Sequence, residues 1–278
     1  MLRIPDAPKS IQKGYPLKNV LGSAAVNCLA NNISIAYPEF QIKKFQKAVL
    51  ENLESLEFMD RGVHIARTLR QFLPDKYEKA IEIILASLTP PNTDTEGLGL
   101  AVLFYHPHGC FISEYGLDKA HNNGDDPFDI SMRAQYELTK RNTSEFSIRP
   151  FLIHEQKRTL SKLKEWMKNP DPHVRRLCSE GTRSRLPWAP RIPAFVNNPK
   201  PILPILKALK NDQNLYVRRS VANNFGDIIK DHPDLVYEIF EQWLNKATKE
   251  VKWLIRHALR YPAKKGDKNA QRLRVAAK

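Results

Sequence analysis

Apolar residues recur every three to four positions through most of the chain, which is the spacing of one face of an α-helix. Two clear runs are Phe45, Val49, Leu53, Leu56 and Tyr77, Ile81, Ile84, Leu88. The pair Pro90-Pro91 follows the second run and predicts its end. Residues 90–100 and 121–128 have the composition of loops, and the short apolar run 101–105 fits either a strand or a buried helix. Helices separated by short turns predict an array of α-helical hairpins.

Two segments in the C-terminal half resemble each other. Residues 169–180 and 212–223 both contain Val-Arg-Arg, at 174–176 and 217–219, with an offset of 43 residues. HEAT-type helical repeats have periods of about 40–47 residues. A looser third copy covers residues 251–258. Because one repeat cannot bury its own apolar face, the repeats must stack. We therefore expect an all-α, HEAT-like helical solenoid with a concave inner surface.

We expect residues 1–278 to form a single solenoid domain. A chain of 278 residues can bury a sizeable core without disulfides or metals. Its three cysteines lie far apart and form no CxxC pair, which favours a reducing cytoplasm. No stretch of about 18 apolar residues predicts a membrane span, and the N-terminus lacks the apolar core of a secretory signal.

Positive charge is concentrated in the second half of the chain. Residues 1–140 contain 15 Lys+Arg and 17 Asp+Glu, whereas residues 141–278 contain 29 and 13, and the whole chain has a net charge of +14. This asymmetry favours a polyanionic partner, nucleic acid first, over a basic surface kept for solubility. The concave surface of the solenoid is then expected to be basic. The candidates for phosphate contact are Arg175, Arg176, Arg183, Arg185, Arg218, Arg219 and Arg256, with Arg191 and Arg260 as weaker ones.

The repeat helices also carry acidic residues on a shared flank. When side chains are placed at 100° per residue, Val174, Leu177, Cys178 and Gly181 form the core stripe of the first copy, and Val217, Val221, Asn224 and Ile228 form that of the second. Glu180 and Asp227 then fall on the same flank of equivalent helices, among arginines. Carboxylates repel phosphates, so their presence in a basic groove points to chemistry. The alternative is that Arg176 and Glu180 form an ordinary i,i+4 ion pair.

Motifs for other chemistries are missing. The 11 glycines form no GxxxxGK or GxGxxG loop, which disfavours nucleotide-dependent chemistry. His106-Pro-His108-Gly-Cys110 fits no standard zinc spacing, and we expect a partly buried loop there rather than a metal site. Neither a metal nor a cofactor is expected.

Four segments resemble the AlkC-type DNA alkylation-repair glycosylases. They are TSEFSIRPFL at 143–152, DPHVRRLCSEGTR continuing to LPW at 171–188, LYVRRSVAN continuing to Asp227 and His232-Pro-Asp234 at 215–234, and WLIRHALR at 253–260. The clear match covers residues 143–266. Residues 1–142 are near neutral and carry no matching motif, and 267–278 form a basic tail.

The resemblance implies a HEAT-like fold and a monofunctional DNA glycosylase that excises alkylated bases, especially 3-methyladenine, and so initiates base excision repair. By motif, the implied active-site residues are Glu145 in SEF, Glu180 in SEG, Trp188 in LPW, and Asp227. The implied partner is double-stranded DNA containing alkylated bases, and we expect a monomer. Many members carry a C-terminal immunoglobulin-like domain. This chain ends too soon for one, so the form without that domain is expected. The segment around Gly226 departs from the family pattern.

The chemistry fits these residue types. A base alkylated on a ring nitrogen is cationic and leaves readily, while the sugar develops positive charge that a carboxylate can stabilise. We assign Asp227 and Glu180 to charge stabilisation and water positioning, and Glu145 to the lesion or to a third carboxylate position. Trp188 offers a flat face for stacking, or else a core position. No lysine stands out as a Schiff-base nucleophile, so no lyase step is expected. The alternative is a non-catalytic HEAT-repeat scaffold for nucleic acid or protein, which would tolerate neutral amides in place of the carboxylates.

Overall fold

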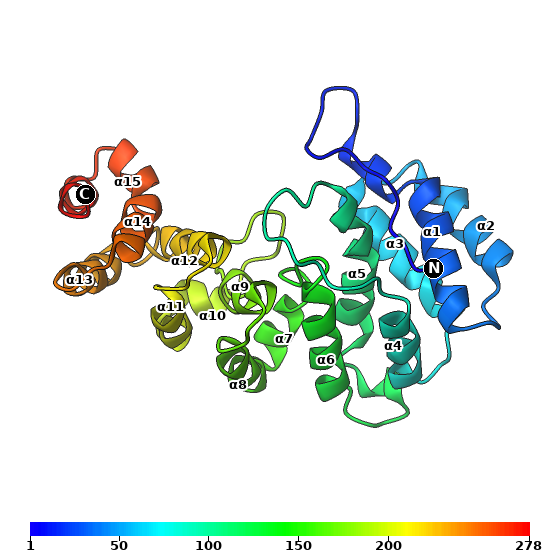
Figure 1. The fold of residues 1–278 in the computed structure, drawn as a ribbon. Helices are drawn as coiled ribbons and strands as arrows, with labels where there is room; N and C mark the ends of the chain where they lie inside the picture. Colours follow the sequence, from blue (N-terminus) through cyan, green and yellow to red (C-terminus); the bar gives the residue numbers. More distant parts are fainter. The chain divides into compact units, whose positions relative to one another are not determined.

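The computed structural model describes all residues from Met1 to Lys278, and its regular structure is entirely helical. The chain divides into two compact units, Met1–Ser147 and Ile148–Lys278 (Figure 1). The all-α class predicted from the sequence is confirmed. A single continuous solenoid over residues 1–278 stays a prediction. None of the helices is long and apolar enough to span a bilayer.

The first unit contains α-helices and three short 3-10 helices. Their bounds are η1 Leu17–Leu21, α1 Ser23–Ala36, α2 Ile42–Leu53, α3 Phe58–Arg70, α4 Tyr77–Ala86, η2 Ala101–Tyr105, α5 His106–Tyr115, η3 Lys119–Asn122 and α6 Phe128–Thr139. Both predicted amphipathic runs form helices, α2 and α4, and bury their apolar stripes. Of the residues in those runs, only Leu56 and Leu88 lie past the helix ends.

Residues 101–110 are helical, which decides one open prediction and corrects another. The run 101–105 is the helix η2, so the open choice between strand and helix is settled. The segment from His106 to Cys110 is not a loop: it begins α5, with Pro107 in the first turn. Proline fits there because its missing N–H would have no helical partner. Burial lowers the pKa of His106 to about 4 and that of His108 to about 3.

The second unit holds the basic part of the chain. Its helices are α7 Arg149–His154, α8 Gln156–Trp166, α9 Pro172–Glu180, α10 Pro193–Asn197, η4 Lys200–Ile202, α11 Leu203–Leu209, α12 Leu215–Ile228, α13 Pro233–Leu244, α14 Lys249–Ala258, α15 Arg260–Lys264 and α16 Lys268–Ala276. The three sequence copies are α9, α12 and α14, and α12 packs against both others (Figure 1). The copies therefore stack side by side, as the repeat predicts.

Local sequence explains where the repeat helices begin. Asp171, Asn214 and Thr248 each cap a helix, accepting a hydrogen bond from a backbone N–H in the first turn of α9, α12 and α14 respectively. The predicted core stripes of α9 and α12 are buried throughout. Within them, Asn224 donates to the carbonyl oxygen of Ser179 at 2.8 Å and to Thr182 Oγ1 at 3.1 Å. This polar link fixes the register of α12 on α9.

Two glycines near the repeat helices differ in the space around them. A Cβ on Gly181 would stand 2.8 Å from Ile148 Cγ2, whereas a Cβ on Gly226 would meet only the Ala258 carbonyl oxygen at 3.5 Å. We expect Gly181→Ala to destabilise the fold by about 1–3 kcal/mol through overpacking. Gly226→Ala should stabilise it by about 0.5–1 kcal/mol, because alanine favours the helix. Denaturant unfolding checks both variants, and shifts of the same sign would contradict this packing.

Candidate active site

One arginine joins the two carboxylates that the helical pattern places on the same flank. Arg183 Nη1 donates to Glu180 Oε1 at 2.7 Å, and Arg183 Nε donates to Asp227 Oδ2 at 2.8 Å. Glu180 ends α9 and Asp227 lies in the last turn of α12. All three side chains are largely buried. The stacked helices therefore bring the predicted carboxylates to a single cationic centre.

Asp227 also borders a cleft. Its second oxygen, Oδ1, accepts from Lys230 Nζ at 3.0 Å. The cleft has a volume of about 670 Å³. It lies between α12 and the α14–α15 segment and is lined by Arg183, Asn223, Gly226, Asp227, Lys230, Ala258, Arg260, Tyr261 and Lys264. We call it the Asp227 cleft. Asp227 is the sole acidic side chain in this lining, so it is the place where positive charge on a ligand would be stabilised.

Glu180 is held ionised in spite of its burial. Burial opposes the charged form, but the positive charges of Arg176 and Arg183 outweigh it and hold the pKa of Glu180 below its ordinary value. The ordinary i,i+4 ion pair between Arg176 and Glu180, which the sequence left open as the alternative, is present, with Arg176 Nη2 3.5 Å from Glu180 Oε1. The link through Arg183 to the next repeat goes beyond that pair.

Trp188 is not a core residue. Its side chain is 66% exposed, and its backbone has a φ of +63°, a conformation that bulky residues adopt only under strain. The loop that carries it is held by Arg149, which is almost fully buried. Arg149 donates to the carbonyl oxygens of Arg183 at 2.9 Å and of Pro190 at 2.8 Å. Arg149 thus holds the loop in place while the Trp188 ring stays exposed, as expected for an aromatic side chain that contacts a ligand.

Glu145 belongs to the first unit. It is buried at 9% exposure, and its Oε2 accepts from Thr143 Oγ1 at 2.7 Å. Its place in a site with the other three residues stays a prediction.

The arginines chosen for phosphate contact have varied surroundings. Arg175 and Arg185 form two-point ion pairs with Asp212 and Asp231. Arg218 and Arg256 donate to backbone carbonyls, Arg176 lies over the ring of Tyr216, and Arg183 is the bridge described above. Arg219 is exposed. Their contact with phosphate stays a prediction, and the ion pairs identify several of them as parts of the fold as well.

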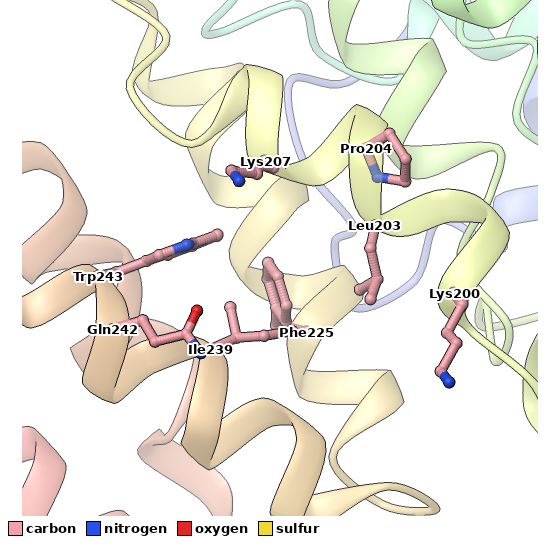
Figure 2. A pocket seen from close by; sticks show the side chains of 8 residues that line it. All are labelled: Lys200, Leu203, Pro204, Lys207, Phe225, Ile239, Gln242 and Trp243. Atoms are coloured by element: carbon pink, nitrogen blue, oxygen red, sulfur yellow. The ribbon is translucent and has the colours of Figure 1, made fainter.

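The far side of α12 carries a different cavity. It has a volume of about 460 Å³ and is lined by Lys200, Leu203, Pro204, Lys207, Phe225, Ile239, Gln242 and Trp243. Figure 2 shows Phe225 between Trp243 and Leu203, with Lys200 pointing away at the edge. No acidic group lines this cavity. It offers no carboxylate to a developing cation, and the Asp227 cleft is the better candidate.

Sequence reasoning missed several side chains of the Asp227 cleft. The sequence gives no site role to Lys230, Lys264 or Asn223, and it makes Arg260 only a weaker candidate. Arg260 Nη2 donates to Asn223 Oδ1 at 3.0 Å, and His257 Nε2 lies 3.3 Å from the same oxygen. Burial lowers the pKa of His257 to about 4, with help from Arg260 and Arg219. The available signal was the three-residue spacing between Asp227 and Lys230, which lies in the turn just past the end of α12.

Comparisons with known proteins agree with the helical repeat. No protein-family model matches the chain. The solved structure of the Pseudomonas fluorescens alkylpurine DNA glycosylase AlkC, bound to DNA containing an abasic site analogue, superposes with a TM-score of 0.80 at 33% identity, covering 93% of this chain and 67% of AlkC. The uncharacterised Bacillus subtilis protein YhaZ is 36% identical over 255 residues, which are 91% of this chain and 66% of YhaZ. The chain thus spans about two thirds of each relative's length.

Proposed function

The chain belongs to the AlkC-type family, and on that premise we propose that it is a DNA glycosylase that hydrolyses the N-glycosidic bond of N-alkylated bases, chiefly 3-methyladenine, in double-stranded DNA. The observation that carries the proposal is the pair of buried carboxylates, Glu180 and Asp227, joined by Arg183 beside a basic cleft. A scaffold needs no such pair, whereas a reaction that creates positive charge does.

The proposed mechanism uses the charge of the lesion. The alkylated base is already cationic and needs no strong general acid. As the glycosidic bond breaks, positive charge moves to the sugar, and Asp227 at the wall of the cleft stabilises it. Glu180 keeps Arg183 in place and thereby orients Asp227, and the carboxylates position the attacking water. The exposed ring of Trp188 stacks on the base or sugar. The basic cleft and its surroundings bind the DNA backbone.

A single hydrolytic step is proposed. A combined glycosylase and lyase would need an amine nucleophile that attacks the sugar. Lys230 and Lys264 line the cleft, and Lys230 Nζ is engaged by Asp227. We expect the abasic strand to remain uncut. We further propose that the protein acts as a monomer, without a metal or cofactor, in the cytoplasm.

Release of free bases from methylated DNA tests the proposal. Purified protein is incubated with DNA treated with a methylating agent, and the released bases are separated and identified. The expected result is free 3-methyladenine with the abasic strands intact. DNA binding without base release would favour the non-catalytic scaffold, and cut strands that depend on Lys230 or Lys264 would overturn the single hydrolytic step.

Trp188→Ala is expected to weaken action on the lesion without unfolding the protein. Stacking of a base on an aromatic ring contributes about 1–3 kcal/mol, so binding to abasic or lesion-containing DNA should fall about 5- to 150-fold. The melting temperature should not change, because the ring is exposed. Trp188→Phe keeps a flat face and serves as the control. A loss of stability with unchanged binding would place Trp188 in the fold rather than at the DNA.

A further inference from the structure

A second basic cavity lies at the C-terminal end of the unit. It has a volume of about 350 Å³ and is lined by Arg256, Ala263, Lys264, Gln271, Arg274, Val275 and Lys278. Four of these side chains are cationic and none is acidic. We call it the distal cavity. Four positive charges around one hollow repel each other unless an anion lies between them.

Arg274 sets this cavity apart from the paired arginines of the unit. Its Nε is buried and has no hydrogen-bond partner. Arg272, two residues earlier on α16, forms an ion pair with Glu241 instead. Leaving a buried donor of a charged group unsatisfied is costly. Nε itself is closed to solvent, so a ligand oxygen would contact the terminal nitrogens of the Arg274 guanidinium, which form no hydrogen bond or ion pair with the protein and belong to a half-buried side chain.

The neighbouring cation is fixed in position. The guanidinium of Arg256 donates through Nη1 to the Ala277 carbonyl oxygen, which ties α14 to the end of α16. A side chain that is already ordered loses little entropy when it binds an anion.

The distal cavity adjoins the Asp227 cleft. Lys264 lines both of them, and α15 supplies residues to each. Because they share Lys264, the Asp227 cleft and the distal cavity form one continuous basic surface rather than two isolated pockets. A single small anion would fill only one hollow, whereas a chain of phosphates spans both.

We propose that the distal cavity binds a phosphodiester of the DNA backbone, on the same duplex whose lesion lies at Asp227. Arg274 and Arg256 contact the phosphate, and Lys264 bridges to the phosphates nearer the lesion. The proposal rests on the proposed function only for the identity of the polyanion, because it concerns binding and not base release.

The test is the salt dependence of DNA binding with two matched variants. Arg274→Gln and Arg272→Gln remove the same charge from the same helix, but only Arg274 lines the distal cavity. The dissociation constant for a duplex with an abasic analogue is measured over a range of salt concentrations. Each phosphate contact adds about 0.9 to the slope of log K against log salt. The slope should fall by about 0.9 for Arg274→Gln and stay at the wild-type value for Arg272→Gln.

Duplex length identifies the source of the phosphate. Duplexes shortened stepwise on one side of the lesion should lose the difference between wild type and Arg274→Gln once the contacted phosphate is removed. Arg274→Lys, which keeps the charge, guards against a folding defect and should keep most of the slope. Equal slopes for wild type and Arg274→Gln would overturn the proposal, as would equal losses in both glutamine variants.

Inorganic phosphate is the second probe. Competition by phosphate at Arg274 with no dependence on duplex length would mean a free-anion site and would also overturn the proposal. Absence of base release with the slope difference intact would instead overturn the proposed function and leave the phosphodiester site standing.

Discussion

Asp227→Asn is expected to slow base release by about 10²–10³-fold, the usual cost of removing one preorganised electrostatic group from an active site. The asparagine side chain fills the same space but brings no negative charge to the Asp227 cleft. The developing charge on the sugar would then face Arg183 and Lys230 without the Asp227 carboxylate that pairs with both. The rate is measured under single-turnover conditions with excess enzyme, so that weaker binding does not enter it.

Two controls show whether Asp227→Asn slows the reaction itself rather than disturbing the fold or the overall charge. Binding to DNA with an abasic analogue should persist in Asp227→Asn, because the basic groups of the cleft remain. Asp234→Asn makes the same chemical change at an exposed position of α13 and should keep the wild-type rate. A variant Asp227→Asn that releases bases as fast as wild type would remove Asp227 from the mechanism.

Arg183→Met is expected to destabilise the second unit by about 3–5 kcal/mol. Removing the shared cation of a buried ion-pair network costs much of its compensation, and here two buried carboxylates would keep only their second partners, Arg176 and Lys230. Unfolding in denaturant measures the loss. Arg185→Met is the matched control, because Arg185 pairs with Asp231 nearer the surface. Its loss should be much smaller. Equal losses for the two variants would contradict a special role for the Arg183 bridge.

The loss of stability in Arg183→Met should depend on pH, and the pKa of Glu180 sets the direction of that dependence. In the wild type the folded-state pKa of Glu180 is depressed, so its ionised form stabilises the fold above the ordinary glutamate range. That contribution is lost as pH falls through the folded-state pKa. The difference in unfolding free energy between wild type and Arg183→Met should therefore be largest near neutral pH and shrink on acidification below about pH 4.5. A difference that grows with acidification would contradict the assignment.

The carboxylate pair can be predicted from the sequence because it follows from two regular spacings along the chain. The 43-residue offset and the 100° helical step together place Glu180 and Asp227 on one flank, and the core stripes that define this flank are buried as expected. These features depend only on local helix geometry and on stacking of like repeats.

Other features of the site depend on side-chain contacts and loop conformations, which the regular spacing of residues does not reveal. Arg183 is predicted to contact phosphate, but its side chain bridges the two carboxylates at the C-terminal ends of α9 and α12. The exposure of Trp188 depends on a left-handed turn, and that turn on the buried Arg149 beneath it. The segment at His106 is expected to be a partly buried loop, but it begins α5, because a proline suits the first turn of a helix.

Base release from a duplex that carries a single 3-methyladenine tests the central claim most directly. Wild-type protein in excess is mixed with the duplex, and free base, strand integrity and binding are followed in the same samples. Stoichiometric 3-methyladenine, an uncut abasic strand and a rate that depends on Asp227 are the results that we predict. Tight, salt-sensitive binding of the duplex with no release of the base would contradict the account and leave a helical-repeat protein that binds DNA without acting on it.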